Sequence, residues 1–173
     1  MALDQALPLP GATHVLVRAE HGFTANVPLA DTLGHVLAER VVAPIDLPPW
    51  DNSGMDGFAV RAADVLGATE ETPVELRILE DVAAGSFPTM PLSPGTATRV
   101  MTGARVPEGA DGVVRVEHTD GGSGIGTATA RVRILRDEDA GRNVRGRGGD
   151  LRAGSCVLDE GAVLRAAEIG VAA

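Results

Sequence analysis

The chain has 173 residues, of which 44% are hydrophobic and 23% charged, a balance typical of a folded globular protein rather than a disordered one. Its formal net charge of −9 disfavours nucleic acids and anionic membranes as partners, because those surfaces are recognised by clustered basic side chains. The sequence has no membrane-spanning apolar run, no signal peptide is expected within Met1–Pro10, and the single cysteine, Cys156, fits a reducing cytoplasm.

The first predicted element is a helix over residues 27–42. Its apolar residues recur at helical spacing, and Pro28 suits a first helical turn. The apolar members of this stripe are Leu29, Leu33, Val36, Leu37 and Val41. The prolines at positions 44, 48 and 49 forbid a helix in the segment that follows.

Three later segments, 74–78, 114–117 and 130–134, alternate apolar and polar residues and are predicted as half-buried strands. Glycine and proline punctuate the chain between them, and the glycine-rich run 121–126 is predicted as a hairpin loop. This pattern indicates a compact antiparallel β domain, barrel-like or with a curved sheet. Beyond it, Cys156 is expected as a small buried residue at a strand start, and a short Ala-rich helix is expected from about Arg165.

Segment 51–57, Asp-Asn-Ser-Gly-Met-Asp-Gly, crowds two carboxylates, an amide and a hydroxyl around a glycine turn. One interpretation is purely structural, because all of these residue types close turns by bonding their own backbone. A calcium loop is excluded, since the alternate positions hold Asp51, Ser53 and Met55 and no bidentate Glu follows. A loop that presents a carboxylate to a substrate or an ion is equally compatible with these residues.

A second candidate site is segment 101–104, where Thr102 precedes Gly103. A threonine hydroxyl beside a glycine can present both the hydroxyl and backbone N–H groups to an anion.

The third candidate site is segment 143–150, which interleaves arginines and glycines and ends in an aspartate. Guanidinium groups offer forked donors for phosphate or other oxyanions, and glycines let a ligand approach the backbone. A solvated basic loop is the simpler alternative for this segment taken alone.

Taken in order, segments 49–61, 99–111 and 143–150 resemble the signature series of molybdopterin molybdenumtransferases and of the related C-terminal domain of gephyrin. The resemblance covers about Val27 to Ala173, and it departs from the family at Gly149, where a glutamate is usual. It implies a mainly β protein with a few helices. A small antiparallel, barrel-like β domain, 47–140, would be inserted in a helix-plus-strand linker domain formed by 1–46 and 141–173.

The resemblance also implies an activity and a set of partners. The family consists of dimeric, cytoplasmic enzymes that use adenylylated molybdopterin, molybdate and a divalent cation, expected to be Mg²⁺, and that leave molybdenum on the pterin. Their active cleft lies between the β domain of one subunit and a pterin-binding α/β domain of the other. That α/β domain and a C-terminal β domain are expected to lie outside this chain, which would therefore be inactive alone. The alternatives are a non-enzymatic oligomerisation or scaffold module of the same fold, or a small oxyanion-binding protein.

Carried over position by position, the resemblance assigns roles to residues of all three motifs. The expected catalytic residues are Asp56, Thr102 and Asp150. The expected metal ligands are two of these, Asp56 and Asp150. The expected contacts to the anionic substrate are Ser53, Arg145 and Arg147.

Overall fold

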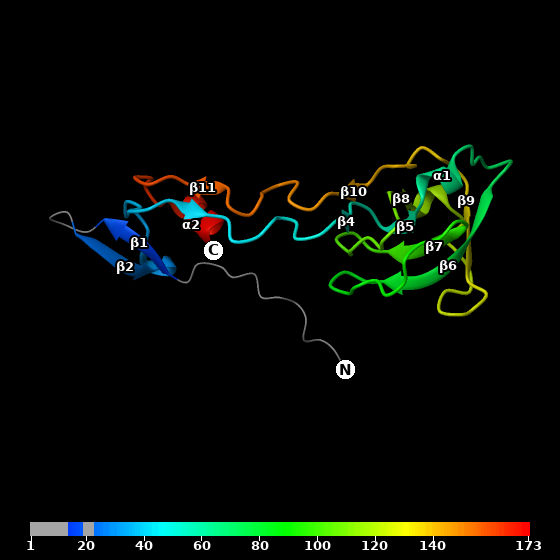
Figure 1. Cartoon of the computed structure of the whole chain (residues 1–173), viewed down its shortest axis with the longest axis horizontal. Helices are drawn as coiled ribbons and strands as arrows, with labels where there is room; N and C mark the ends of the chain where they lie inside the picture. The colour runs from blue at the N-terminus through cyan, green and yellow to red at the C-terminus, as the bar shows by residue number, and fades with distance from the viewer. Residues whose placement is uncertain (1–13, 19–22) are drawn as a thin grey trace. The chain divides into compact units, whose positions relative to one another are not determined.

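A computed structural model describes residues 14–18 and 23–173, so the expectations for Met1–Pro10 lie outside the described residues. The chain divides into two compact units, one built from the described residues before Pro48 together with Asp150–Ala173, the other from Pro48–Gly149 (Figure 1). Residues 141–149, which the sequence analysis assigned to the linker domain, pack with the second unit. Among the described residues, no helix combines the length and apolar character needed to cross a membrane.

The first unit is built from short strands around a small apolar core. Its elements are β1 (His14–Arg18), β2 (Thr24–Pro28), the 3₁₀ turn η2 (Leu29–Asp31), β3 (Val41–Val42), β11 (Cys156–Leu158) and α2 (Ala166–Ala172). β1 pairs with β2 and β11 with β3, both antiparallel. The core of this unit consists of Val15, Val17, Leu29, Leu37, Leu164 and Ala172.

The helix predicted over 27–42 is wrong, because this segment forms β2, η2 and β3 joined by irregular backbone. Gly34 adopts a left-handed φ of 81°, which interrupts any helix. Leu37 instead bridges to Val17 and is fully buried, while Leu33 of the supposed apolar stripe is 67% exposed. Helical spacing of apolar residues was therefore coincidental, and contacts from distant strands decide the conformation.

Two expectations for the C-terminal segment had different outcomes. The predicted helix is confirmed as α2, and Glu168 accepts a hydrogen bond from the backbone N–H of Arg165 at its start. Cys156 does begin a strand, but the prediction that it is buried is wrong. β11 pairs only with β3, and the Cys156 side chain lies on the exposed side of this two-stranded ribbon, 3.4 Å from Asp159 Oδ1.

The second unit is a curled, mainly antiparallel sheet. Its elements are β4 (Asn52–Ser53), β5 (Gly57–Val60), α1 (Ala62–Val65), β6 (Val74–Val82), β7 (Thr96–Val100), β8 (Gly112–Arg115), the 3₁₀ turn η3 (Val116–His118), β9 (Arg131–Ile134) and β10 (Val144–Arg145). The main sheet has the order β8-β5-β7-β6-β9, and only the β6–β7 pair is parallel. β4 pairs separately with β10.

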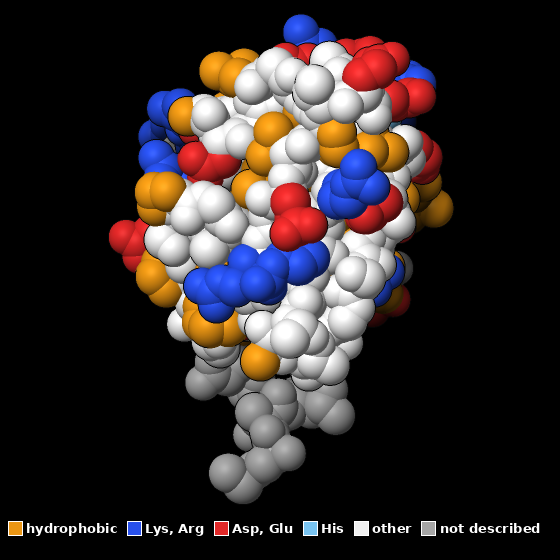
Figure 2. Space-filling model, turned by 90° about the vertical axis from the view of Figure 1, so that its right-hand side faces the viewer, with side chains coloured by type: hydrophobic (Ala, Val, Ile, Leu, Met, Phe, Trp, Pro, Cys, Tyr) orange, Lys and Arg blue, Asp and Glu red, His pale blue; other side chains and the backbone are white. Residues whose placement is uncertain are grey.

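The curl of this sheet brings its two edges together. Thr119, just after η3, bridges to Ile134 of β9, which produces the half-barrel (Figure 1). The strands predicted at 74–78 and 130–134 are confirmed within β6 and β9. The strand predicted at 114–117 is confirmed only in its first half, because β8 ends at Arg115 and η3 follows. The concave core is closed by Phe58, Val60, Leu76, Ile78, Val114, Val132 and Ile134. Acidic and basic side chains are interspersed over the surface of this unit that Figure 2 shows.

Gly57, the first residue of β5, allows β5 and β8 to approach more closely than any side chain would permit. A Cβ atom at this position would lie 2.0 Å from the Val114 carbonyl oxygen and 2.9 Å from the Arg115 Cα. The backbone of Asp56 is held at the same place, because Val116 N–H donates a 3.0 Å hydrogen bond to the Asp56 carbonyl oxygen. The spacing of the two strands at Gly57 therefore fixes where Asp56 lies.

A second constraint on β8 is the buried carboxylate of Asp139, which is 2% exposed. The Arg115 guanidinium donates two 2.9 Å hydrogen bonds to it, and Arg115 N–H donates a third of 3.1 Å. Burial by itself would raise the pKa of Asp139, but these hydrogen bonds lower it to about 2. His118 Nδ1 lies 3.1 Å from the same carboxylate.

We expect Gly57→Ala to lower the free energy of unfolding by about 3 kcal/mol or more, because the strands would have to separate. Gly146→Ala is the matched control, since a Cβ there would meet nothing nearer than Asp51 Oδ1 at 3.9 Å. Urea unfolding of both variants measures the difference. Equal stability of the two variants would contradict the close-approach argument.

We expect Asp139→Asn to flatten the acid dependence of stability. The folded-state pKa of about 2 lies below the usual 3.8, so the stabilisation is present above pH 4 and is lost as pH falls toward 2. The natural chain should lose about 2 kcal/mol of unfolding free energy over this interval through Asp139. Urea unfolding at several pH values checks this, with Asp81→Asn, in an exposed pair with Arg99, as the control. Parallel pH profiles for the natural chain and Asp139→Asn would refute the assignment.

Candidate functional site

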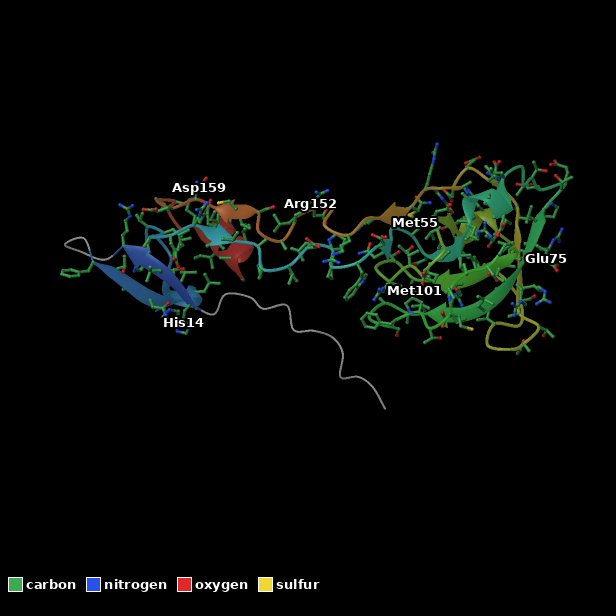
Figure 3. All side chains as sticks on the ribbon, viewed as in Figure 1. His14, Met55, Glu75, Met101, Arg152 and Asp159 are labelled. Atoms are coloured by element: carbon green, nitrogen blue, oxygen red, sulfur yellow. The ribbon has the colours of Figure 1, made fainter. Side chains whose placement is uncertain are left out.

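The three motifs meet in one small three-stranded arrangement in the second unit. Segment 51–54 lies in the middle, with 103–106 on one side and 143–147 on the other. Ser53 N–H donates to the Ala104 carbonyl and Gly103 N–H to the Ser53 carbonyl, both at 2.9 Å. On the other side, Gly54 N–H donates to the Asn143 carbonyl at 2.7 Å. In Figure 3, Met55 and Met101 mark the first two motifs within this unit.

Asp56 and Thr102, expected as catalytic residues, are in direct contact. Thr102 donates two hydrogen bonds of 2.6 Å to Asp56 Oδ1, one from its hydroxyl and one from its backbone N–H. The hydroxyl bond, then the N–H bond and then the charge of Arg99 lower the pKa of Asp56. Asp56 is therefore a carboxylate near neutral pH, and Oδ2 accepts no hydrogen bond from the described residues.

This contact changes the role that the sequence suggested for Thr102. Its hydroxyl and N–H were expected to face an anion, but both donate to Asp56. The hydroxyl oxygen retains lone pairs and can still accept a hydrogen bond from a ligand. Thr102 therefore orients Asp56 and lowers its pKa, and a direct contact of Thr102 with substrate stays a prediction.

Ser53 closes the turn that leads to Asp56. It is fully buried, its hydroxyl donates to the Met55 carbonyl, and its Oγ accepts a 3.2 Å hydrogen bond from Met55 N–H. The structural-turn interpretation of segment 51–57 therefore holds for Ser53, while the exposed Asp56 fits the interpretation of a presented carboxylate. A substrate contact of Ser53 stays a prediction.

Asn143 joins two parts of the site from an unusual backbone conformation. It is the one non-glycine residue with positive φ, 65°, in the described part of the chain. Asparagine tolerates this region better than other side chains do. Its Nδ2 donates a 2.9 Å hydrogen bond to the Val113 carbonyl, and its own carbonyl accepts from Gly54 N–H. Asn143 thus connects β8 to the loop before Asp56.

The remaining predicted residues lie along segment 143–150. Arg145 is exposed on β10. Arg147 N–H donates a 2.7 Å hydrogen bond to Asp51 Oδ1, and both residues belong to the second unit. Asp150 is the first residue of the closing segment of the first unit, where its N–H donates to the Leu47 carbonyl at 2.9 Å. The predicted pair of metal ligands, Asp56 and Asp150, is therefore divided between the two units.

The donor set can be compared with what Mg²⁺ requires. The described residues contain no group of three or more His, Cys, Asp or Glu side chains that could hold a metal ion. Mg²⁺ does not need such a cage, because it commonly binds one or two carboxylates and completes its octahedron with water and substrate phosphates. The ionised Asp56, with Oδ2 available, fits that role.

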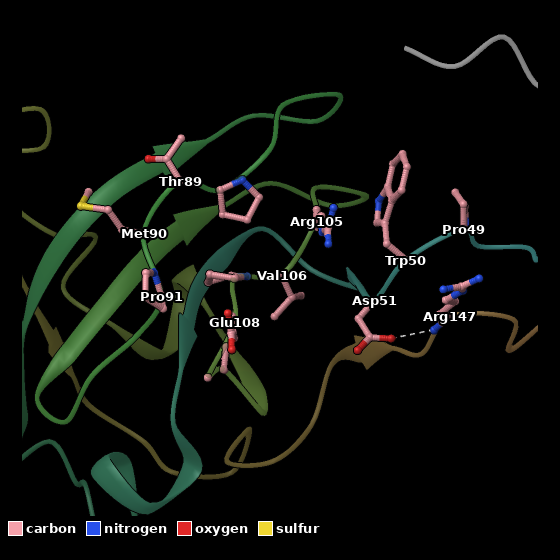
Figure 4. Close-up of a pocket in the computed structure, with 14 residues that line it drawn as sticks. Pro49, Trp50, Asp51, Thr89, Met90, Pro91, Arg105, Val106, Glu108 and Arg147 are labelled. Atoms are coloured by element: carbon pink, nitrogen blue, oxygen red, sulfur yellow. Dashed lines mark hydrogen bonds between the residues drawn. The ribbon is translucent and has the colours of Figure 1, made fainter. Parts of the chain in front are cut away.

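A pocket of about 780 Å³ opens in the second unit beside the three motifs (Figure 4). Residues lining it include Trp50, Asp51, Thr89, Arg105, Glu108 and Arg147. The Trp50 and Phe87 rings meet edge to face at 5.2 Å, and the Arg105 guanidinium lies 5.6 Å from the Phe87 centroid. Sequence reasoning missed Arg105 and this pocket. The available signal was Trp50, the only tryptophan of the chain, directly before the first motif.

Glu80, which lies outside the three motifs, holds part of the pocket wall in place. The Glu80 carboxylate accepts hydrogen bonds from Thr89 N–H at 3.0 Å, the Thr89 hydroxyl at 2.8 Å and Met90 N–H at 3.1 Å. Three donors on one carboxylate hold segment 88–91 in place. These hydrogen bonds therefore fix the backbone on this side of the pocket.

Comparisons with known proteins identify the family of this chain. A family model described as the MoeA N-terminal region (domain I and II) matches residues 2–173. Molybdopterin molybdenumtransferase 2 of Mycobacterium tuberculosis is 46% identical over 148 residues, which cover 86% of this chain and 35% of the relative. The molybdopterin molybdenumtransferase of Bacillus subtilis is 36% identical over 162 residues, which cover 92% of this chain and 37% of the relative.

A solved structure of a related protein has a similar fold. The molybdopterin biosynthesis MoeA protein from Pyrococcus horikoshii superposes with a TM-score of 0.73 at 35% identity, covering 83% of this chain and 36% of that one. The predicted mainly β fold with a curved sheet is thereby confirmed. The chain spans about a third of the length of these relatives, as their covered shares of 35% to 37% show. Sequence, fold and motif geometry together show that this chain belongs to the molybdopterin molybdenumtransferase family and corresponds to its N-terminal region.

Proposed function

We propose that this chain supplies the N-terminal part of an enzyme that inserts molybdate into adenylylated molybdopterin, in the cytoplasm. The names of the relatives support the substrates, and the hydrogen-bonded pair of Asp56 and Thr102 is the observation that carries the proposal. An exposed carboxylate that is presented at a turn and oriented by two donors on one oxygen suits the binding of a cation or a polarised water. The chain covers 35% to 37% of the length of these relatives, so the insertion activity is proposed for a protein of their full length.

The roles of the individual side chains follow from their positions. Asp56 would hold Mg²⁺ through Oδ2 in the complete enzyme, and a metal contact of Asp150, which belongs to the other unit, stays a prediction. When bound, Mg²⁺ would supply positive charge that neutralises the phosphates of the adenylylated substrate. Thr102 orients Asp56, and Arg145 and Arg147 would contact the anionic substrate with forked donors.

The protein would act as a homodimer. On the first unit, several large apolar side chains are exposed although the unit is small, and exposed apolar side chains often belong to a partner surface. The exposed fractions are 73% for Phe23, 67% for Leu33, 48% for Val163 and 55% for Val171. A two-fold dimer would let two copies cover the same surface on each other.

In the complete enzyme, Asp56→Asn should reduce molybdenum insertion by at least about tenfold, roughly 1.4 kcal/mol of transition-state stabilisation. The asparagine oxygen can still accept both hydrogen bonds from Thr102, so the turn persists while the charge is lost. Asp120→Asn is the matched control, because Asp120 Oδ1 also accepts two backbone hydrogen bonds, from Gly122 and Arg133. AMP release and molybdenum content are measured, with the 173-residue chain alone expected to release no AMP. Unchanged turnover in Asp56→Asn, or AMP release by the chain alone, would reject the proposal.

Light scattering at tens of micromolar should give about twice the chain mass of 17.7 kDa if the apolar surface of the first unit is an interface. Leu33→Glu and Val171→Glu should shift the protein toward monomer, because each buries a charge at the contact. Leu66→Glu, at a residue 66% exposed in the second unit, serves as the control. A monomer at this concentration, or a dimer unaffected by both substitutions, would show that this surface is not the interface.

A further inference from the structure

Asn143 is the one position in the described part of the chain at which a positive φ, 65°, is not carried by glycine. A residue required only for this backbone conformation would be glycine, because glycine adopts it without steric strain. Asparagine tolerates the conformation less well but brings a side chain. Backbone strain persists where the surrounding contacts over-determine it, so the contacts of this side chain indicate what Asn143 does.

The Asn143 side chain ties its own segment to β8. Its Nδ2 donates a 2.9 Å hydrogen bond to the Val113 carbonyl, while Val113 N–H donates a 2.9 Å hydrogen bond to the carbonyl of the preceding residue, Arg142. Both backbone polar groups of Val113 are therefore bonded to residues 142 and 143. A glycine at position 143 would keep the N–H bond to Arg142 and would lose the side-chain bond.

The backbone of Asn143 contacts a different segment, the one that leads to Asp56. Its carbonyl accepts a 2.7 Å hydrogen bond from Gly54 N–H, and a Cβ atom at Gly54 would lie only 3.2 Å from the same carbonyl oxygen. From Gly54 the chain passes through the turn that Ser53 closes and reaches Asp56 two residues later. Asn143 therefore faces this segment with its backbone and β8 with its side chain.

The end of β8 fixes the backbone on the far side of Asp56. Val116 N–H, directly after β8, donates a 3.0 Å hydrogen bond to the Asp56 carbonyl, and the next residue, Gly57, packs directly on β8. The Asp56 backbone is thus held at Gly54 before it and at β8 after it, and Asn143 bonds both of these elements. Loss of the Asn143 side chain would let the two elements shift relative to each other.

Asp56 must also lie at the right place relative to Thr102, which follows a different strand, β7. Thr102 donates to Asp56 Oδ1 at 2.6 Å from both its hydroxyl and its N–H. Hydrogen bonds weaken steeply as their angle departs from linear, so two short bonds to one oxygen tolerate little displacement. A shift of the Asp56 backbone would therefore weaken both of them.

We propose that Asn143 is a positioning residue for Asp56. Its side-chain amide ties β8 to the segment before Asp56 and thereby fixes the Asp56 carboxylate against Thr102. The importance of this placement for molybdenum insertion rests on the proposed function, whereas the placement itself is a property of the 173-residue chain and can be measured there. In this role Asn143 touches no substrate and acts only through Asp56.

Asn143→Gly separates the side chain from the backbone conformation. Glycine adopts a φ near 65° more readily than asparagine, so the backbone bond to Gly54 is retained while the Nδ2 bond to Val113 is lost. If Asn143 served only the turn, this variant would behave like the natural chain. Asn143→Asp is the second variant, because aspartate also tolerates this conformation but turns an acceptor toward the Val113 carbonyl.

Amide-detected NMR of the 173-residue chain measures hydrogen exchange at Thr102 N–H, the donor to Asp56. Both Asn143 variants should speed this exchange by at least about fivefold relative to the natural chain. Thr96→Ala is the matched control, because it removes a buried hydroxyl bonded to the Ser93 carbonyl at the other end of β7. It should leave the exchange within about twofold of the natural chain, and thermal unfolding confirms that all variants are folded.

A double-mutant cycle in the complete enzyme tests whether Asn143 acts through Asp56. Asn143→Gly should reduce molybdenum insertion by at least about fivefold when Asp56 is present. In the Asp56→Asn background the same substitution should change insertion by less than about twofold, since a residue that acts through another has no effect once that residue is disabled. Independent structural damage would instead lower activity by the same factor in both backgrounds.

The proposal is overturned if Thr102 N–H exchanges at the natural rate in both Asn143 variants, or if the losses in the cycle are additive. Its failure can be told apart from failure of the proposed function. Full activity of Asp56→Asn would reject the enzymatic role of Asp56, and the exchange at Thr102 would still decide whether Asn143 positions the carboxylate. Natural exchange at Thr102 with an inactive Asp56→Asn would leave the enzymatic role intact and reject the role of Asn143.

Discussion

The arrangement of this protein's site depends on one short stretch of backbone, residues 51–54, that is hydrogen-bonded on both sides. Ser53 N–H and carbonyl pair with segment 103–104, and Gly54 N–H pairs with Asn143. Because a middle strand has no free edge, the two outer segments are fixed in register relative to it. Every functional side chain considered above lies on one of these three segments or within a few residues of them.

This pairing fixes the positions of an acidic residue and of two basic residues around the first motif. Beyond the end of the middle strand, Asp56 is presented at a turn, where two hydrogen bonds from Thr102 orient it and lower its pKa. On one face of the strand, Arg105 and Arg145 flank Asn52. The Asp56 carboxylate and these two arginines thus lie on neighbouring segments without forming a salt bridge with one another.

The rest of the second unit keeps these segments in place. Gly57 sets the closest approach of β5 to β8, and the buried ion pair of Arg115 and Asp139 ties β8 to the segment that precedes β10. Asn143 completes this link through its bonds to Val113 and Gly54. The cost of burying Asp139 is offset because three donors satisfy it, so this charge can serve as a rigid anchor close to Asp56.

The sequence by itself determined the features that depend on local chemistry. Alternating apolar residues predicted β6 and β9, and the Ala-rich end predicted α2. The residue types of the three motifs predicted the family and the candidate residues Asp56, Thr102 and Arg145. Tertiary structure decided what depends on partners far along the chain. It replaced the helix expected over 27–42 with strands, because the burial of Leu37 against Val17 and Leu164 outweighs helical spacing. It turned the Thr102 donors toward Asp56, and it placed Arg105 beside Asn52 through a register that only the folded backbone sets.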